Sequence, residues 1–108
     1  MYEYQAKLIR VVDGDTVDLM VDMGCRIYNE MRCRLYGINA PERNTEDGPE
    51  ATEFLLGLLS SATTITIETY KDRKEKYGRF LARIFVDGNT VSVNEIMVES
   101  RHAVRYMD

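Results

Sequence analysis

Polar and apolar residues alternate through residues 4–12 and again through residues 15–23, with Asp13-Gly14 between the two stretches. A period of two is typical of a strand that buries one face, and Asp-Gly is a strong signal for a tight hairpin turn. A second hairpin is expected through residues 23–25, leading into a third strand at about residues 30–38. The pattern therefore predicts three consecutive antiparallel strands.

A helix is expected next, because Gly48-Pro49-Glu50 places a proline and an acid in a first turn. Apolar residues then repeat at helical spacing to about Ser60: Ala51, Phe54, Leu55, Leu58 and Leu59. Strands are predicted at residues 63–70 and 80–86, and a short helix at residues 92–100. This order predicts a mainly β domain with helices (α+β). Its expected form is a five-stranded OB-fold barrel with a helix between strands three and four and a short C-terminal helix.

The gross composition predicts one soluble domain over residues 1–108, since 108 residues are enough for a single core. No apolar run approaches the roughly 20 residues of a membrane helix, and the first residues lack the features of a signal peptide. We therefore expect no membrane partner and a cytoplasmic location. Cys25 and Cys33 are expected to be free thiols, because neither they nor His102 form a zinc-binding pattern.

The charge is unevenly distributed along the chain. The net charge of −4 argues mildly against a general nucleic-acid binder, which is usually basic. Residues 71–83, however, carry six basic and two acidic side chains, whereas residues 42–53 carry five acidic and one basic. A charge run alone is more often a solvated surface than a binding site, so the basic segment is only a candidate for contacting phosphates.

Two carboxylates and two guanidiniums lie near the ends of strand-like runs: Asp15, Arg34, Glu42 and Arg79. Carboxylates can hold a cation and handle a water, and planar guanidiniums grip phosphate oxygens in a fork. These groups are what cleavage of a phosphodiester on a metal ion requires, so a nuclease is the leading hypothesis. The structural alternatives are a plain hairpin turn at Asp15, an exposed loop glutamate at Glu42 and an ion pair at Arg34.

The chain closely resembles the staphylococcal nuclease (thermonuclease) family over nearly its whole length. Six motifs in family order carry the resemblance: Val-Asp-Gly-Asp-Thr at 12–16, Arg-Leu-x-Gly-Ile-x-x-Pro-Glu at 34–42, Gly-Pro-Glu-Ala at 48–51, Lys-Tyr-Gly-Arg at 76–79, Asp-Gly at 87–88 and Val-Asn-Glu at 93–95. The family fold is an OB barrel. The resemblance implies a Ca²⁺-dependent nuclease that acts on DNA, RNA or both and leaves 3′-phosphates.

The resemblance also implies a role for each matched residue. Arg34 and Arg79 match the family's catalytic arginines, and Glu42 matches the glutamate that serves the attacking water. The implied Ca²⁺ ligands are Asp15, Asn39 and the backbone carbonyl of Ala40. The positions that hold the nucleotide are Lys76, Tyr77 and Tyr106.

Asn39 is the departure from the family that matters most, since the family has an aspartate there. An amide oxygen can still ligate Ca²⁺, but one negative charge is gone, so weaker Ca²⁺ binding is expected. Arg101 also stands where a glycine often ends the preceding helix. The main alternative is therefore a nucleic-acid-binding OB module that has lost cleavage. A protein-interaction domain that uses the acidic surface is a weaker third possibility.

Overall fold

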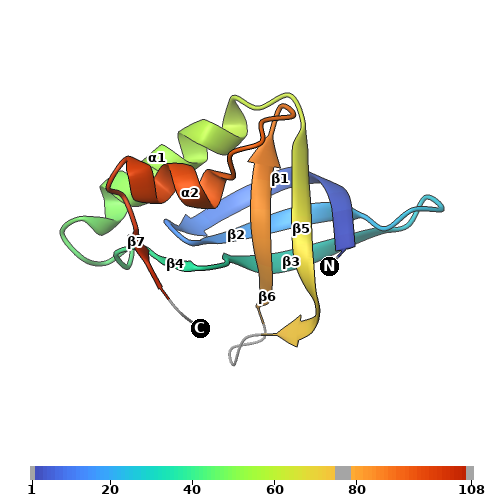
Figure 1. The fold of residues 1–108 in the computed structure, drawn as a ribbon, viewed down its shortest axis with the longest axis horizontal. Coiled ribbons are helices and arrows are strands. Elements are labelled where there is room, and N and C mark those ends of the chain that lie inside the picture. The colour runs from blue at the N-terminus through green and yellow to red at the C-terminus, as the bar shows by residue number, and fades with distance from the viewer. Residues whose placement is uncertain (1, 75–78, 107–108) are drawn as a thin grey trace.

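Five strands close into a barrel in the order β1-β2-β3-β6-β5 (Figure 1). The computed structural model describes residues 2–74 and 79–106, without the side chains of residues 71–74. The barrel strands are β1 (Tyr2–Asp13), β2 (Thr16–Asp22), β3 (Tyr28–Leu35), β5 (Ile65–Lys74) and β6 (Phe80–Val86). The mainly β barrel predicted from the alternating pattern is confirmed.

The pairing of the strands gives the OB arrangement. β1, β2 and β3 pair antiparallel in sequence order, and β1 also pairs antiparallel with β5. The barrel closes where β3 runs parallel to β6, with Arg34 opposite Leu81. Parallel neighbours need a crossover connection, and the helix predicted between the third and fourth barrel strands lies on that crossover.

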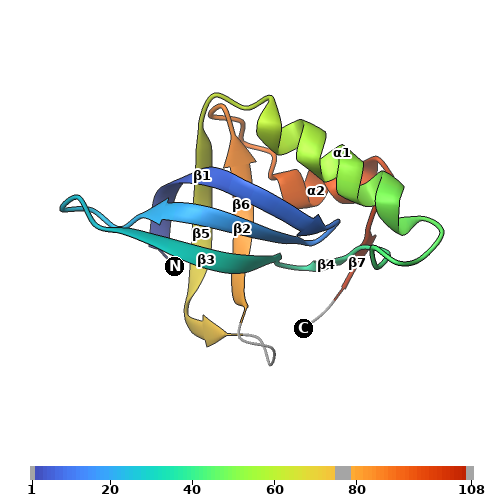
Figure 2. The same ribbon diagram turned by 180° about the vertical axis from the view of Figure 1, so that it is seen from behind.

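Two helices pack beside one end of the barrel, as both side views show (Figures 1 and 2). The first, α1 (Gly48–Ser60), has Pro49 in its first turn and buries Ala51, Leu55 and Leu59. The second, α2 (Val93–Glu99), begins after Ser92, whose side chain accepts a hydrogen bond from the Glu95 N–H. In the described part of the chain, no helix has the length and apolar character needed to cross a membrane.

The core is built from the inward-facing residues of the strands. Val17, Leu19 and Val21 of β2 are fully buried, while the alternate residues of the strand point outward. Cys33 lies in the same core, and burial raises the pKa of its thiol to about 12. Cys33 and the exposed Cys25 are both free, as predicted.

The third strand is shorter than predicted. β3 ends at Leu35, and Gly37 adopts a positive φ of 79° that turns the chain before β4 (Ile38–Asn39). β4 pairs with β7 (Val104–Arg105) in a separate two-stranded sheet. The prediction of one strand over residues 30–38 was therefore wrong at its end, because Gly37 permits a backbone conformation that breaks the strand.

Candidate active site

Most of the predicted site residues that the structure describes lie at the end of the barrel beside α1, where three segments approach closely. Gly14, in the turn between β1 and β2, makes this possible. A Cβ added at Gly14 would lie 2.7 Å from the Ala40 Cβ and 3.0 Å from the Ala51 Cβ. The glycine therefore allows the turn to touch both the segment after β4 and the helix α1, which places Asp15 against Ala40.

Asp15 is almost completely buried, and each of its carboxylate oxygens accepts a hydrogen bond. Its Oδ2 accepts from the Ala40 N–H at 2.9 Å, and its Oδ1 accepts from the Thr16 Oγ1 at 3.1 Å. The Arg34 Nη2 lies 4.0 Å from Asp15 Oδ2, which is a long ion pair. The Asp15 carboxylate is therefore fixed by contacts with other segments, unlike the side chain of an exposed hairpin turn.

A second carboxylate lies beside Asp15. The Oδ1 of Asp13 accepts a hydrogen bond from the Asp15 N–H at 3.3 Å. Burial, followed by the side-chain hydrogen bond and the charge of Asp15, raises the pKa of Asp13 to about 6. Sequence reasoning used Asp13 only as a turn former. Its position two residues from Asp15 in the same turn was the available signal that the two carboxyl groups are neighbours.

Arg34 is buried, with only 7% of its surface exposed, and its guanidinium is held by backbone carbonyls. Nη1 donates to the carbonyls of Leu35 at 2.9 Å and Ile38 at 2.8 Å. Nη2 donates to Asn39 Oδ1 at 3.3 Å, and the Tyr106 ring centroid lies 5.4 Å from Cζ. The turn between β3 and β4 therefore wraps around the guanidinium and fixes its plane.

Arg79 reaches the same turn from the start of β6. Its Nη1 donates to the Thr16 Oγ1 at 3.2 Å, and that hydroxyl in turn donates to Asp15. Thr16 thus connects Arg79 to the Asp15 carboxylate. Sequence reasoning did not select Thr16 as a site residue, although it is the last residue of the Val-Asp-Gly-Asp-Thr motif.

Glu42 lies on the exposed loop between β4 and α1. Its carbonyl accepts hydrogen bonds from the Thr45 N–H at 2.9 Å and the Thr45 Oγ1 at 2.6 Å. A Cβ added at Gly48 would lie 1.8 Å from that carbonyl oxygen, so the loop closes tightly on itself. Its backbone is therefore fixed, while the side chain of Glu42 is accessible to solvent.

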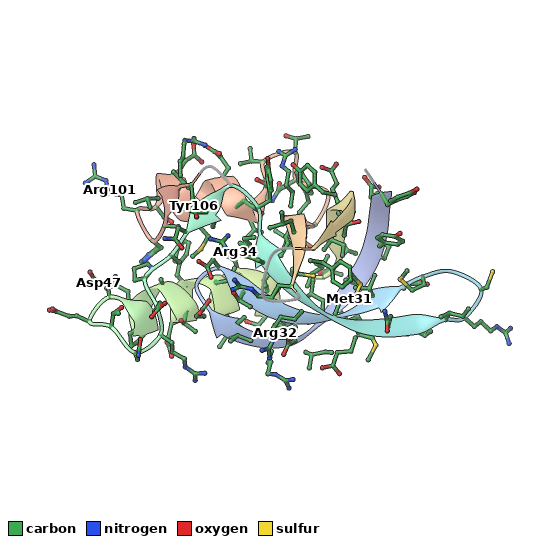
Figure 3. All side chains as sticks on the ribbon, turned by 90° about the horizontal axis from the view of Figure 1, so that it is seen from below. Met31, Arg32, Arg34, Asp47, Arg101 and Tyr106 are labelled. Carbon is green, nitrogen blue, oxygen red and sulfur yellow. The ribbon has the colours of Figure 1, made fainter. Side chains whose placement is uncertain are left out.

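The structure brings together most of the predicted site. Asp15, Arg34, Asn39 and Ala40 are linked by direct hydrogen bonds or a long ion pair, and Arg79 joins them through Thr16. Tyr106 lies beside Arg34 (Figure 3). Glu42 is two residues from Ala40, and its contacts within the described part of the chain are made by its backbone carbonyl, not by its carboxylate. Lys76 and Tyr77 lie outside the described residues.

The oxygen atoms of this corner fit a hard cation. In the described ranges, no group of three His, Cys, Asp or Glu side chains is placed to hold a metal. The candidate set instead mixes the Asp15 carboxylate with the Asn39 amide oxygen, and both atoms lie near the Arg34 Nη2. Such a set suits Ca²⁺, which accepts carboxylate, amide and carbonyl oxygens, and is unsuited to zinc.

A pocket of about 530 Å³ opens next to this corner. Asn39, Ala40 and Pro41 form one wall, the start of α1 forms another, and residues 100–104 form a third. Two of the candidate metal ligands, Asn39 and Ala40, therefore line a cavity large enough for part of a nucleotide, while Asp15 lies behind them in contact with Ala40.

Comparison with known protein families gives one match that covers most of the chain. Residues 32–107 match the family model described as staphylococcal nuclease homologue. The match covers most of the chain, including Arg34, Glu42 and Arg79. The chain belongs to the staphylococcal nuclease family.

Individual relatives agree with this assignment. The chain is 32% identical over 111 residues to protein ParB of Escherichia coli and 32% identical over 105 residues to an uncharacterized endonuclease of Escherichia coli O157:H7. It is 29% identical over 115 residues to endonuclease YhcR of Bacillus subtilis. Each alignment covers 96% of this chain but only 58%, 62% and 9% of the respective relative. The family and the endonuclease names of two of these relatives support nuclease activity at the level of the family.

Proposed function

We propose that this chain is a Ca²⁺-dependent nuclease that hydrolyses phosphodiester bonds of DNA, RNA or both and leaves 3′-phosphates. The observation that carries the proposal is the Arg34 guanidinium, which is buried, held by two carbonyls and adjacent to both Asp15 and Asn39. A structural ion pair does not need a planar donor whose orientation is fixed by three acceptors. A site that must meet a phosphate in one orientation does need it.

The two arginines would stabilise the charge that develops on the phosphoryl oxygens during attack. Arg34 is already oriented by its carbonyl contacts, so little reorganisation is needed when the substrate arrives. Arg79 approaches from β6 on the other side of Thr16. Together they can grip a phosphate held over the turn that contains Asp15.

Ca²⁺ would be held by the carboxylate of Asp15, the amide oxygen of Asn39 and the carbonyl of Ala40. A bound divalent cation supplies positive charge to a phosphate oxygen and makes a coordinated water more acidic. Asp13 adds negative charge next to Asp15. That charge partly compensates for the missing carboxylate at Asn39.

Glu42 would accept a proton from the attacking water or orient that water. Its backbone is fixed by Thr45 and Gly48, while its carboxylate is accessible to solvent and therefore to a substrate. Lys76 and Tyr77 would contact the far phosphate and the sugar of the nucleotide, and Tyr106, whose ring lies beside the Arg34 guanidinium, would line the base pocket.

A second candidate function is nucleic-acid binding without cleavage. The observation that favours it is Asn39, whose Oδ1 accepts a hydrogen bond from Arg34 and carries no charge to attract a cation. In this case Ca²⁺ would have little effect on the interaction with nucleic acid.

The test is an assay of single-stranded DNA, duplex DNA and RNA with the protein at millimolar Ca²⁺ and again with a chelator. End-labelling of the products before and after phosphatase treatment reveals whether the fragments carry 3′-phosphates. The proposal predicts cleavage that stops with the chelator and 3′-phosphate ends. Binding without cleavage would establish the second candidate, and cleavage that ignores the chelator would contradict a Ca²⁺ mechanism.

A further inference from the structure

Arg10 and Arg32 form a second pair of arginines on the outer face of the barrel. They belong to the row of cross-strand partners that follows the row containing Arg34. Thr16 of β2 pairs with Arg34 of β3, and two residues further along the same strands Asp18 pairs with Arg32. Arg10 of β1 pairs with Asp18 from the other side. Residues two apart on a strand share a face, so Arg32 and Arg34 point outward from the same side of the sheet (Figure 3).

Asp18 is the centre of this second row. The Arg32 Nε and Nη2 donate to its two oxygens at 2.8 Å and 3.0 Å, and the Arg10 Nε lies 2.7 Å from its Oδ2. Although it stands on the outer face, Asp18 is only 2% exposed, because the two arginines cover it. The hydrogen bond from Arg32 lowers the pKa of Asp18, so the carboxylate is ionised at neutral pH.

The arginines themselves remain accessible to solvent. Their side chains are 57% exposed at Arg10 and 49% exposed at Arg32. The further contact of Arg10 to Glu30 is long, at 3.5 Å. Asp18 therefore holds two guanidiniums in fixed positions while part of each is presented to solvent, on the surface of a protein whose net charge is −4.

The spacing of the two rows suits a nucleic-acid backbone. Two residues along a strand span about 6.6 Å, which is close to the separation of successive phosphates in an extended single strand. In OB folds the face of the second and third strands is a common surface for oligonucleotides. A phosphate at Arg34 would thus place its neighbour beside Arg32 and Arg10.

We infer that Arg10 and Arg32 form a binding site for the backbone phosphate adjacent to the one that is cleaved, with Asp18 as their positioning residue. This inference rests on the proposed function for the location of the scissile phosphate. The site contacts only the backbone, so it recognises single-stranded nucleic acid without regard to base sequence.

The experiment measures binding and cleavage separately for an Arg10→Gln/Arg32→Gln double variant. The probe is a fluorescent oligothymidylate of about a dozen nucleotides, matching the longer site sizes of OB folds. Its affinity is followed by anisotropy in chelator, where no Ca²⁺-dependent cleavage occurs, at several salt concentrations. The matched control is Arg26→Gln/Arg105→Gln, which removes the same number of positive charges elsewhere: Arg26 is exposed in the turn between β2 and β3, and Arg105 is an exposed arginine of β7 that is ion-paired with Glu95. Thermal melting of each variant checks that the barrel is intact.

We expect the double variant to bind the oligonucleotide roughly tenfold more weakly, the size of one lost charge-assisted contact. The slope of log affinity against log salt concentration should become shallower by about 0.7 in the double variant, which is the value for one phosphate contact on a single strand. In cleavage assays KM should rise for the long oligonucleotide and stay unchanged for a dinucleoside monophosphate, because that substrate contains only the scissile phosphate. An Arg10→Lys/Arg32→Lys variant should recover part of the affinity.

Unchanged affinity and salt slope in a folded double variant would overturn the inference, even if the parent protein cleaves DNA normally. An equal loss in Arg26→Gln/Arg105→Gln would also overturn it, because the effect would then be one of overall charge. If the parent binds but does not cleave, and the double variant still loses affinity and slope, the proposed function fails while the phosphate site stands.

Discussion

Asn39 limits the negative charge available to a cation at this site. Its amide oxygen contacts the Arg34 Nη2 at 3.3 Å and lies beside the segment that hydrogen-bonds to Asp15. The residue was recognised from its place in the motif Arg-Leu-x-Gly-Ile-x-x-Pro-Glu. Its contact with Arg34 could not be predicted, because it depends on the turn at Gly37 that folds β4 back toward the guanidinium.

Replacing Asn39 by aspartate should strengthen Ca²⁺ binding. A carboxylate about 4 Å from the ion adds on the order of a few kcal/mol of attraction at an effective dielectric near 20, part of which Arg34 offsets. We therefore expect the Ca²⁺ dissociation constant of Asn39→Asp to fall at least about tenfold, measured by calorimetric titration. The control Asn89→Asp adds the same charge in the exposed turn after β6. The same gain in both variants would contradict a specific ligand at Asn39.

Asp18 links stability to pH at the residue scale. Its pKa in the folded protein is below the ordinary value of 3.8, chiefly because of the hydrogen bond from Arg32. The folded state therefore binds this proton less readily than the unfolded state. The resulting stabilisation is fully present above pH 3.8 and is lost as the pH falls through the lower folded-state pKa.

Asp18→Asn should accordingly destabilise the protein at neutral pH by about 1 kcal/mol or less, since both arginines are half-exposed and screened by solvent. The difference in the free energy of unfolding between the variant and the parent should disappear below pH 3.8. Urea denaturation at a series of pH values measures it. Asp47→Asn serves as the control, because Asp47 makes no side-chain cap hydrogen bond. A difference in the free energy of unfolding that stays constant into strong acid would show that the ionised Asp18 carboxylate is not the source of the stabilisation.

At the scale of elements, sequence reasoning succeeded where local signals were strong. The bounds of α1 and β6 agree with prediction, because Pro49 marks the helix start and the apolar periodicity continues to its end. It failed at β4 and β7, since two-residue strands carry no periodicity and their pairing joins residues far apart in the chain. The contact between Arg79 and Thr16 and the row around Asp18 were missed for a related reason, as both depend on strand register.

The end of α2 contains a local strain that the sequence did indicate. Arg101 follows the helix with φ at 66°, a left-handed conformation that favours glycine. The N–H groups of Arg101 and His102 still bond to the carbonyls of Val98 and Met97, so the helix terminates regularly despite the strain.

Arg101→Gly should therefore stabilise the protein by about 0.5–1 kcal/mol, the left-handed penalty of a side chain reduced by the flexibility of glycine in the unfolded state. Ser100→Gly is the comparison, because Ser100 has φ at −85° and its hydroxyl donates to Ile96. That variant should lose stability. Chemical denaturation of the two variants measures both, and a destabilised Arg101→Gly would show that the arginine side chain contributes more than the strain costs.

At the scale of the whole molecule, the barrel and the helices assemble the site from segments that are distant in sequence. Asn94 of α2 joins them, because its amide donates to the carbonyls of Tyr36 at 2.9 Å and Ala82 at 3.1 Å and accepts from the Ile84 N–H at 3.1 Å. It thereby holds the turn that encloses Arg34 against β6. The Val-Asn-Glu motif thus has a structural reason, which the sequence resemblance alone did not provide.

The single-turnover cleavage rate of Arg34→Lys, compared with the parent and with Arg83→Lys on one labelled oligonucleotide at saturating Ca²⁺, tests the central claim most directly. Lysine keeps the positive charge but loses the planar fork that two backbone carbonyls orient. We predict that a folded Arg34→Lys cleaves at least about a hundredfold more slowly, while Arg83→Lys matches the parent. A folded Arg34→Lys that cleaves as fast as the parent would contradict phosphodiester cleavage at this end of the barrel.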